Sequence, residues 1–125
     1  MKRSLTLTPL SREHHQALVF SKRLKEIFNA PSDKQLQQWL TFKPLLVAAL
    51  LPHFEEEERY FLHELGVSSQ HHLIQHMLQD HQSIRDYIDA QELDKVSVFA
   101  DLLKAHVRFE ERKLFPWLEE TYALN

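Results

Sequence analysis

One pattern occurs twice in this chain of 125 residues, and it restricts the possible fold more than any other feature. The copies begin at His53 and at His106, and each continues with a Glu four residues later, a second Glu and then an Arg. Positions i and i+4 lie one turn apart on the same face of an α-helix. Each copy therefore predicts a helix that presents an imidazole and a carboxylate to one point, and the aligned repeat indicates an internal duplication.

The composition favours an all-α protein, because the chain has one glycine, five prolines and many Leu, Glu, Gln, Lys and Arg residues. Its length predicts a single domain over residues 1–125. The net charge of −3 gives no electrostatic reason to expect a nucleic acid or a membrane as partner. No secretory signal or membrane-spanning run is predicted. The absence of Cys excludes disulfides and thiolate metal sites, and it fits a cytoplasmic location.

Apolar periodicity, caps and stop signals predict four helices, over residues 9–29, 33–65, 68–90 and 94–122. Thr8 and Asp94 are the expected N-caps of the first and last helices, residues 32–35 read as a capping box, and Gly66 is the expected stop of the second helix. The first and third helices also match one another, with an acidic residue before His14 and before His81, so the chain reads as a duplicated helical hairpin, which predicts an up-down-up-down four-helix bundle.

The second helix contains Pro44 and Pro52. A straight helix from Asp33 would place His53 roughly 10 Å beyond the level of His14, at a rise of about 1.5 Å per residue. We therefore expect this helix to be broken or kinked near Pro44, with residues 32–42 forming a short helix or an overhang.

All four predicted helices carry polar residues on their apolar faces at the same level of the bundle. The candidate metal ligands are His14, His53, Glu57, His81, His106 and Glu110. Four imidazoles and two carboxylates suit iron, manganese or zinc. Two carboxylates from opposed helices can bridge two ions about 3.5 Å apart, with two histidines completing each ion and with coordination positions left open for a small molecule.

Several alternatives stay open at this stage. The six side chains could form a metal-free network of hydrogen bonds. His76, which forms a third His-x-x-x-acid pair with Asp80, is a possible fifth histidine ligand. Glu58 and Glu111 adjoin the candidate ligands and could orient a ligand from behind. An acidic residue also precedes His14 and His81. The remaining histidines, His15, His63, His71 and His72, are expected at the surface.

Four motifs in order resemble the hemerythrin-like HHE cation-binding family across nearly the whole chain. They are Leu10-Ser-Arg-Glu-His14-His15, Leu51-Pro52-His53-Phe54 with Glu57-Glu58, Gln79-Asp80-His81, and His106 with Glu110-Glu111-Arg-Lys-Leu-Phe115-Pro116. The resemblance implies a four-helix bundle that holds a carboxylate-bridged non-haem di-iron centre. Carried over residue by residue, it implies the same six ligands that the helical spacing selects.

Classical oxygen-carrying hemerythrins have a fifth histidine one turn before the histidine that corresponds to His81, where this chain has Met77. This departure argues against simple reversible oxygen carriage. We expect a di-iron protein that binds or senses dioxygen or a related small molecule, or handles iron. The alternatives are a di-iron enzyme acting on peroxide or nitric oxide, for which Tyr60 and Tyr87 are candidate proton donors, and a metal-free helical interaction protein. No catalytic residue and no protein partner is assigned.

Overall fold

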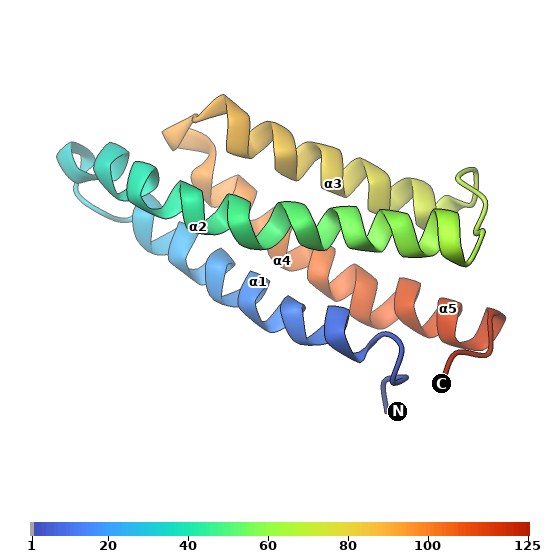
Figure 1. Cartoon of the computed structure of the whole chain (residues 1–125). Helices are drawn as coiled ribbons and strands as arrows, with labels where there is room; N and C mark the ends of the chain where they lie inside the picture. Colours follow the sequence, from blue (N-terminus) through green and yellow to red (C-terminus); the bar gives the residue numbers. More distant parts are fainter. Residues whose placement is uncertain (1) are drawn as a thin grey trace.

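The computed structural model, which describes residues 2–125, contains four helical arms that run alternately up and down (Figure 1). The first three arms are α1 (Thr8–Phe28), α2 (Ser32–Glu58), which continues directly into the π-helical turn η1 (Arg59–Glu64), and α3 (His72–Ala90). The fourth consists of the 3-10 turn η2 (Leu93–Lys95), α4 (Val96–Phe109), the π-helical turn η3 (Glu110–Leu114) and α5 (Phe115–Thr121). Residues 2–125 contain no strand. The predicted four-helix bundle is confirmed.

The second arm is not broken at Pro44. The α2 helix runs without interruption, with Pro44 and Pro52 inside it. Each proline removes one backbone donor, but both residues are exposed, so water can bond the carbonyls that lose their partners. The additional length becomes an overhang instead: the first turns of α2 reach past the end of α1 in Figure 1, and Leu36 and Leu40 remain about half exposed there.

Two of the expected caps differ from the structure. Thr8 is the first helical residue of α1 and follows the N-cap Leu7, and the Thr8 hydroxyl donates to the carbonyl of Ser4 (2.6 Å). Residues 32–35 do not form a capping box. Pro31 is the N-cap of α2, and no side-chain hydrogen bond from the described residues caps this end of the helix. The Gln35 amide instead donates to the carbonyl of Phe28 (2.8 Å) and so closes the end of α1.

Of the other three boundaries, the one at Gly66 is as expected, and the starts of α3 and α4 differ. Gly66 follows the end of the second arm with a φ of +70°, which is the left-handed conformation that a helix stop requires. The α3 helix begins four residues later than expected, because the His71 ring accepts a hydrogen bond from the Leu73 N–H and caps it. Asp94 lies within the 3-10 turn rather than at the N-cap of α4.

The apolar core consists of two clusters. The loop-end core lies toward the α1–α2 and α3–α4 connections, and its largest members are Phe20, Trp39, Phe42, Phe54 and Phe99. The terminal core lies toward the chain ends and the α2–α3 connection. Its members are Leu7, Leu10, Phe61, Val67, Ile74, Met77, Phe109, Leu114, Phe115 and Leu118. Each fully buried side chain of this kind stabilises the fold by about 1.5–3 kcal/mol.

A layer of buried polar residues separates the two cores. It contains His14, His53, Glu57, His81, His106 and Glu110. Uncompensated, the burial of two carboxylates among apolar side chains would cost several kcal/mol. No helix among the described residues is long and apolar enough to cross a membrane.

Candidate metal centre

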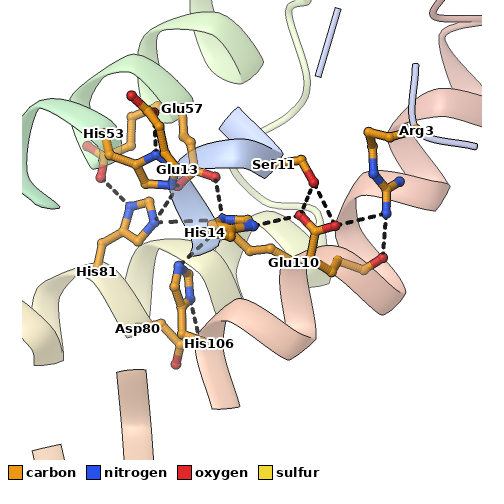
Figure 2. A network of polar contacts seen from close by, with 12 residues as sticks. Arg3, Ser11, Glu13, His14, His53, Glu57, Asp80, His81, His106 and Glu110 are labelled. Atoms are coloured by element: carbon orange, nitrogen blue, oxygen red, sulfur yellow. Dashed lines mark hydrogen bonds and ion pairs between the residues drawn. The ribbon is translucent and has the colours of Figure 1, made fainter. Parts of the chain in front are cut away.

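The six predicted side chains come together from all four arms of the bundle, as Figure 2 shows. We call them the His/Glu centre: His14 from α1, His53 and Glu57 from α2, His81 from α3, His106 from α4 and Glu110 from the start of η3. Each is at most 5% exposed. Helical spacing alone placed each His–Glu pair on one face. The packing of four amphipathic helices then brings the pairs and the single histidines to one level.

The ligand atoms form two overlapping groups that could each hold a cation. His14, His53, Glu57 and Glu110 form the first, and Glu57, His81, His106 and Glu110 form the second. The atoms of each group lie within 4.8 Å of one another. Both carboxylates belong to both groups, so two ions held here would share them as bridges. Each group supplies two nitrogens and two oxygens, a donor set that suits iron, manganese or zinc.

The two halves of the chain build these groups with matching contacts. Glu57 Oε1 lies 3.3 Å from His53 Nε2, and Glu110 Oε1 lies 3.3 Å from His106 Nε2. Across the halves, His14 Nε2 lies 2.7 Å from Glu110 Oε1 and 3.8 Å from Glu57 Oε2. Correspondingly, His81 Nε2 lies 3.1 Å from Glu57 Oε1 and 3.8 Å from Glu110 Oε2. The duplicated sequence therefore produces a centre of near twofold symmetry.

Hydrogen bonding within the protein does not satisfy this centre. Nε2 of His53, His81 and His106, both oxygens of Glu57 and Oε2 of Glu110 are buried and have no hydrogen-bond partner among the described residues. Buried polar atoms are rarely left in this state. These atoms converge on the same small volume and are all good ligands for a divalent cation, so the residues present fit a metal pair.

Every histidine of the centre is held from behind by a carboxylate on its Nδ1. Glu111 lies 2.6 Å from His14, Glu13 lies 2.7 Å from His53, Glu58 lies 2.7 Å from His81 and Asp80 lies 3.0 Å from His106. Each of these four residues is the sequence neighbour of another member of the centre. A carboxylate on Nδ1 fixes the ring orientation and leaves Nε2 free to face a metal.

Glu58 and Glu111 were predicted to take this role, whereas Glu13 and Asp80 were missed. The available signal was the acidic residue that precedes His14 and His81. The periodicity places that residue away from the apolar face of its own helix, and only the packing of the next helix reveals its partner.

Two histidines of the centre stack on a phenylalanine that also carries an arginine over its ring. Phe54 stacks on the His81 ring (4.0 Å), and Arg85 lies over Phe54 (5.6 Å) while it pairs with Glu58 (3.1 Å). Phe115 stacks on His14 (5.2 Å), and Arg3 lies over Phe115 (5.5 Å).

Arg3 also pairs with Glu111 (3.2 Å) and so fixes the carboxylate that orients His14. Sequence reasoning missed both arginines: Arg3 precedes the first predicted helix, and Arg85, although it lies four residues after His81, meets Phe54 and Glu58 of another helix only through packing.

Both glutamates of the centre lie at a π-helical turn. Glu57 is followed by η1, which begins at Arg59, and Glu110 is itself the first residue of η3. Such turns contain one additional residue and are frequent at functional sites. Here they change the helical register directly after the ligand pair, which a spacing of 3.6 residues per turn cannot predict.

The electrostatics indicate that protons occupy this centre when no cation does. Burial lowers the pKa of His14, but the carboxylates of Glu110 and Glu111, which accept hydrogen bonds from its ring, and the nearby carboxylate of Glu57 outweigh it and raise the pKa to about 11. The pKa of His106 is raised to about 9, because the charge of Glu110 and the hydrogen bond that Asp80 accepts outweigh burial. Although burial opposes it, the surrounding imidazoliums hold the pKa of Glu110 well below its ordinary value.

Three further residues singled out in the sequence lie outside the centre. His76 is half exposed, stacks on Phe109 (3.7 Å) and contacts Asp80 (3.2 Å), so it is not a fifth histidine of either group. Among the described residues, no hydrogen bond joins Tyr60 or Tyr87 to the centre. Tyr87 stacks instead on Phe99 in the loop-end core (5.5 Å).

Comparison with known proteins gives one family. The sequence model of the family described as the hemerythrin HHE cation binding domain matches residues 5–118, which include all six residues of the His/Glu centre. Searches of curated proteins and of solved structures gave no match.

Proposed function

Because the chain belongs to the hemerythrin HHE cation binding domain family, we propose that its His/Glu centre holds two iron ions and binds or senses dioxygen or a related small molecule, or handles iron. The observation that carries this proposal is the pair of overlapping ligand groups with unpartnered, buried Nε2 and carboxylate atoms. Manganese or zinc would fit the same donor set.

A bound iron pair would supply the open coordination positions at which a small molecule binds. The protein residues contribute orientation and exclusion of water. Glu57 and Glu110 would hold both ions, and their negative charges would offset part of the charge of the pair. Glu13, Glu58, Asp80 and Glu111 keep the histidine rings aligned, and Phe54 and Phe115 cover the rings of His81 and His14.

The enzyme alternative has less support from the site. Acid–base catalysis needs a proton donor that reaches the reacting molecule. Among the described residues, every carboxylate at the centre already faces a histidine, and neither Tyr60 nor Tyr87 hydrogen-bonds to it. A binding or sensing role needs no such donor.

The test is elemental analysis of untagged protein, as purified and after anaerobic loading with ferrous iron, together with its absorption spectrum under air. We expect about two irons per chain, as the two ligand groups require, and an iron-dependent absorption in the near ultraviolet. Zinc or manganese in place of iron would keep the site and remove the dioxygen proposal. Failure to bind any divalent metal would overturn the proposed function.

Variants test whether the carboxylates are shared. Glu57→Ala and Glu110→Ala should each lose both ions, because each carboxylate belongs to both groups. His53→Ala removes a residue that belongs to only one ligand group, so it should weaken the binding of one ion more than that of the other. Glu55→Ala is the control, since Glu55 is an exposed residue of the same helix. Loss of only one ion in both glutamate variants would contradict the shared arrangement.

A further inference from the structure

A cavity lies on the surface between α1 and the fourth arm, lined by residues outside the six of the His/Glu centre. Its volume is about 620 Å³, within the usual range of roughly 300–1,000 Å³ for small-molecule sites. Leu18 and Val107 contribute its apolar lining, and Ser21, which bonds the Ala100 carbonyl (2.8 Å), holds the two helices together beneath it. We call this cavity the α1–α4 groove.

The groove carries a concentration of positive charge that the overall charge of −3 conceals. Five basic residues line it: Lys22 and Lys25 from α1, and Lys104, Arg108 and Arg112 from the fourth arm. Lys104 and Arg108 lie one turn apart on α4, and Arg112 follows in η3, so the three form a row on the side of the cavity that the fourth arm contributes. Lys22 reaches the same cavity from the opposite side.

The two acidic residues of the groove do not neutralise this row. Asp101 pairs with Lys25 (2.9 Å). Glu111 is held by Ser11 (2.8 Å), by Arg3 and by His14. By contrast, the structure of residues 2–125 gives Lys22, Lys104, Arg108 and Arg112 no ion pair and no hydrogen bond. Four cations that have no partner therefore surround one apolar strip.

The unpaired cations and the apolar strip together define the chemistry of a molecule that fits the α1–α4 groove. Guanidinium groups bind phosphate with two parallel hydrogen bonds, and ammonium groups add a point charge. The spread of the cations along the groove suits separate anionic groups better than a single anion. The strip formed by Leu18 and Val107 suits an apolar or aromatic body. A long nucleic acid would need a basic surface that continues beyond one groove.

We propose that the α1–α4 groove binds a small organic molecule that carries at least two phosphate groups. Its apolar body lies on Leu18 and Val107, and its phosphates contact Lys104, Arg108 and Arg112 from the fourth arm and Lys22 across the groove. The groove adjoins the His/Glu centre through Glu111, which orients His14, but none of its cations belongs to that centre, so its occupancy does not depend on the identity of the metal.

The test is isothermal titration calorimetry of the metal-loaded protein with adenosine 3′,5′-bisphosphate, at low and at moderate salt. Its two separate phosphates match the groove, and it lacks the linked phosphate chain that would extract metal. We expect one site per chain, about tenfold weaker binding of adenosine monophosphate, and no binding of adenosine. Affinity should fall as salt rises, because the cations are exposed.

Variants locate the site. Arg108→Ala and the double variant Lys22→Glu/Lys104→Glu should each weaken binding about tenfold or more. Arg12→Ala and Lys34→Ala are the matched controls, since both residues are exposed and neither lines the groove. Metal content and circular dichroism should stay unchanged in Lys22→Glu/Lys104→Glu, whose two positions are exposed and outside the centre.

Three results would overturn the proposal. Adenosine could bind as tightly as the bisphosphate, or the Lys22→Glu/Lys104→Glu variant could retain full affinity. The third is binding of poly-glutamate by the groove in place of the bisphosphate, since the occupant would then be an acidic protein segment. Each of these results leaves the metal analysis of the His/Glu centre unaffected.

Discussion

Glu13 and Asp80 are counterparts in the two halves of the chain, and each binds a histidine of the helix that follows it. Glu13 lies 2.7 Å from His53 Nδ1, and Asp80 lies 3.0 Å from His106 Nδ1. Their surroundings differ, because the Glu13 side chain is 57% exposed whereas the Asp80 side chain is 14% exposed. Water can replace Glu13 but has little access to Asp80.

The first prediction follows from this difference. Asp80→Ala should weaken metal binding by about 10–100-fold, because His106 loses the carboxylate that orients its ring. Glu13→Ala should have a smaller effect, since water can accept the His53 N–H. Competition with a chelator of known affinity measures both values. Asp89→Ala, at an exposed position of the same helix, is the control for Asp80→Ala, and equal effects of Asp80→Ala and Glu13→Ala would contradict the argument.

The second prediction concerns the fifth histidine considered from the sequence. His76→Ala should retain two ions per chain, because the His76 side chain is 51% exposed and contacts Asp80 rather than the centre. His81→Ala should lose metal, since His81 is fully buried within it. Elemental analysis of the two variants after identical loading distinguishes these outcomes. A metal loss in His76→Ala comparable to that in His81→Ala would place His76 among the ligands.

The third prediction is a pH dependence of the metal-free protein. The pKa of His106 is raised from 6.5 to about 9 and that of His14 to about 11. A raised pKa contributes stability that is fully present below the unfolded value of 6.5 and is lost as pH rises through the folded value. The pKa of Glu57 and Glu110 is lowered, so their contribution is present above 4.5 and is lost at lower pH.

Thermal unfolding of the metal-free protein should therefore occur at the highest temperature between about pH 4.5 and 6.5 and at progressively lower temperature above that range. Metal competes with protons for the same nitrogens, so its binding strengthens as pH rises. The difference in Tm between loaded and metal-free protein should widen from pH 6.5 to pH 9. A constant difference across this range would show that the histidines are neutral in the metal-free state.

The fourth prediction tests the apolar packing. Phe99→Ala should reduce the free energy of unfolding by about 3–5 kcal/mol, because Phe99 is 1% exposed and contacts both Trp39 and Tyr87. Leu45→Ala should change it by less than about 0.5 kcal/mol, since Leu45 is 61% exposed. Chemical denaturation of the metal-free proteins compares the two.

The sequence predicts the bundle well because its main signals are local. The His–Glu pairs at i and i+4, Gly66 at a helix end and the four apolar stripes each follow from the geometry of a single helix. Because the duplicated hairpins impose one level on all four helices, the same signals also bring together the six residues of the centre.

Other features depend on contacts that no local rule contains. Pro44 remains inside α2 because its exposed position allows water to compensate, and burial of Trp39 and Phe42 supports the helix on the side facing the core. Arg3 reaches Glu111 over 108 positions of sequence, and the π-helical turn η3 shifts the register after Glu110. These features arise only when the complete bundle has formed.

The division of the apolar core by a polar layer has a consequence for the cooperativity of unfolding. The terminal core includes Leu7, just before α1, and Leu118 of α5, and it is separated from the loop-end core by the buried histidines and glutamates. Without a metal, the two cores are connected mainly by the helices that run through both of them. The polar layer between them contains several atoms that have no hydrogen-bond partner in the part of the chain that the structure describes. We expect amide hydrogen exchange to reveal a separate opening of the terminal core in the metal-free protein. A metal pair bound by all four arms would join both cores into one cooperative unit, so that the ends of the chain open only when the whole bundle does.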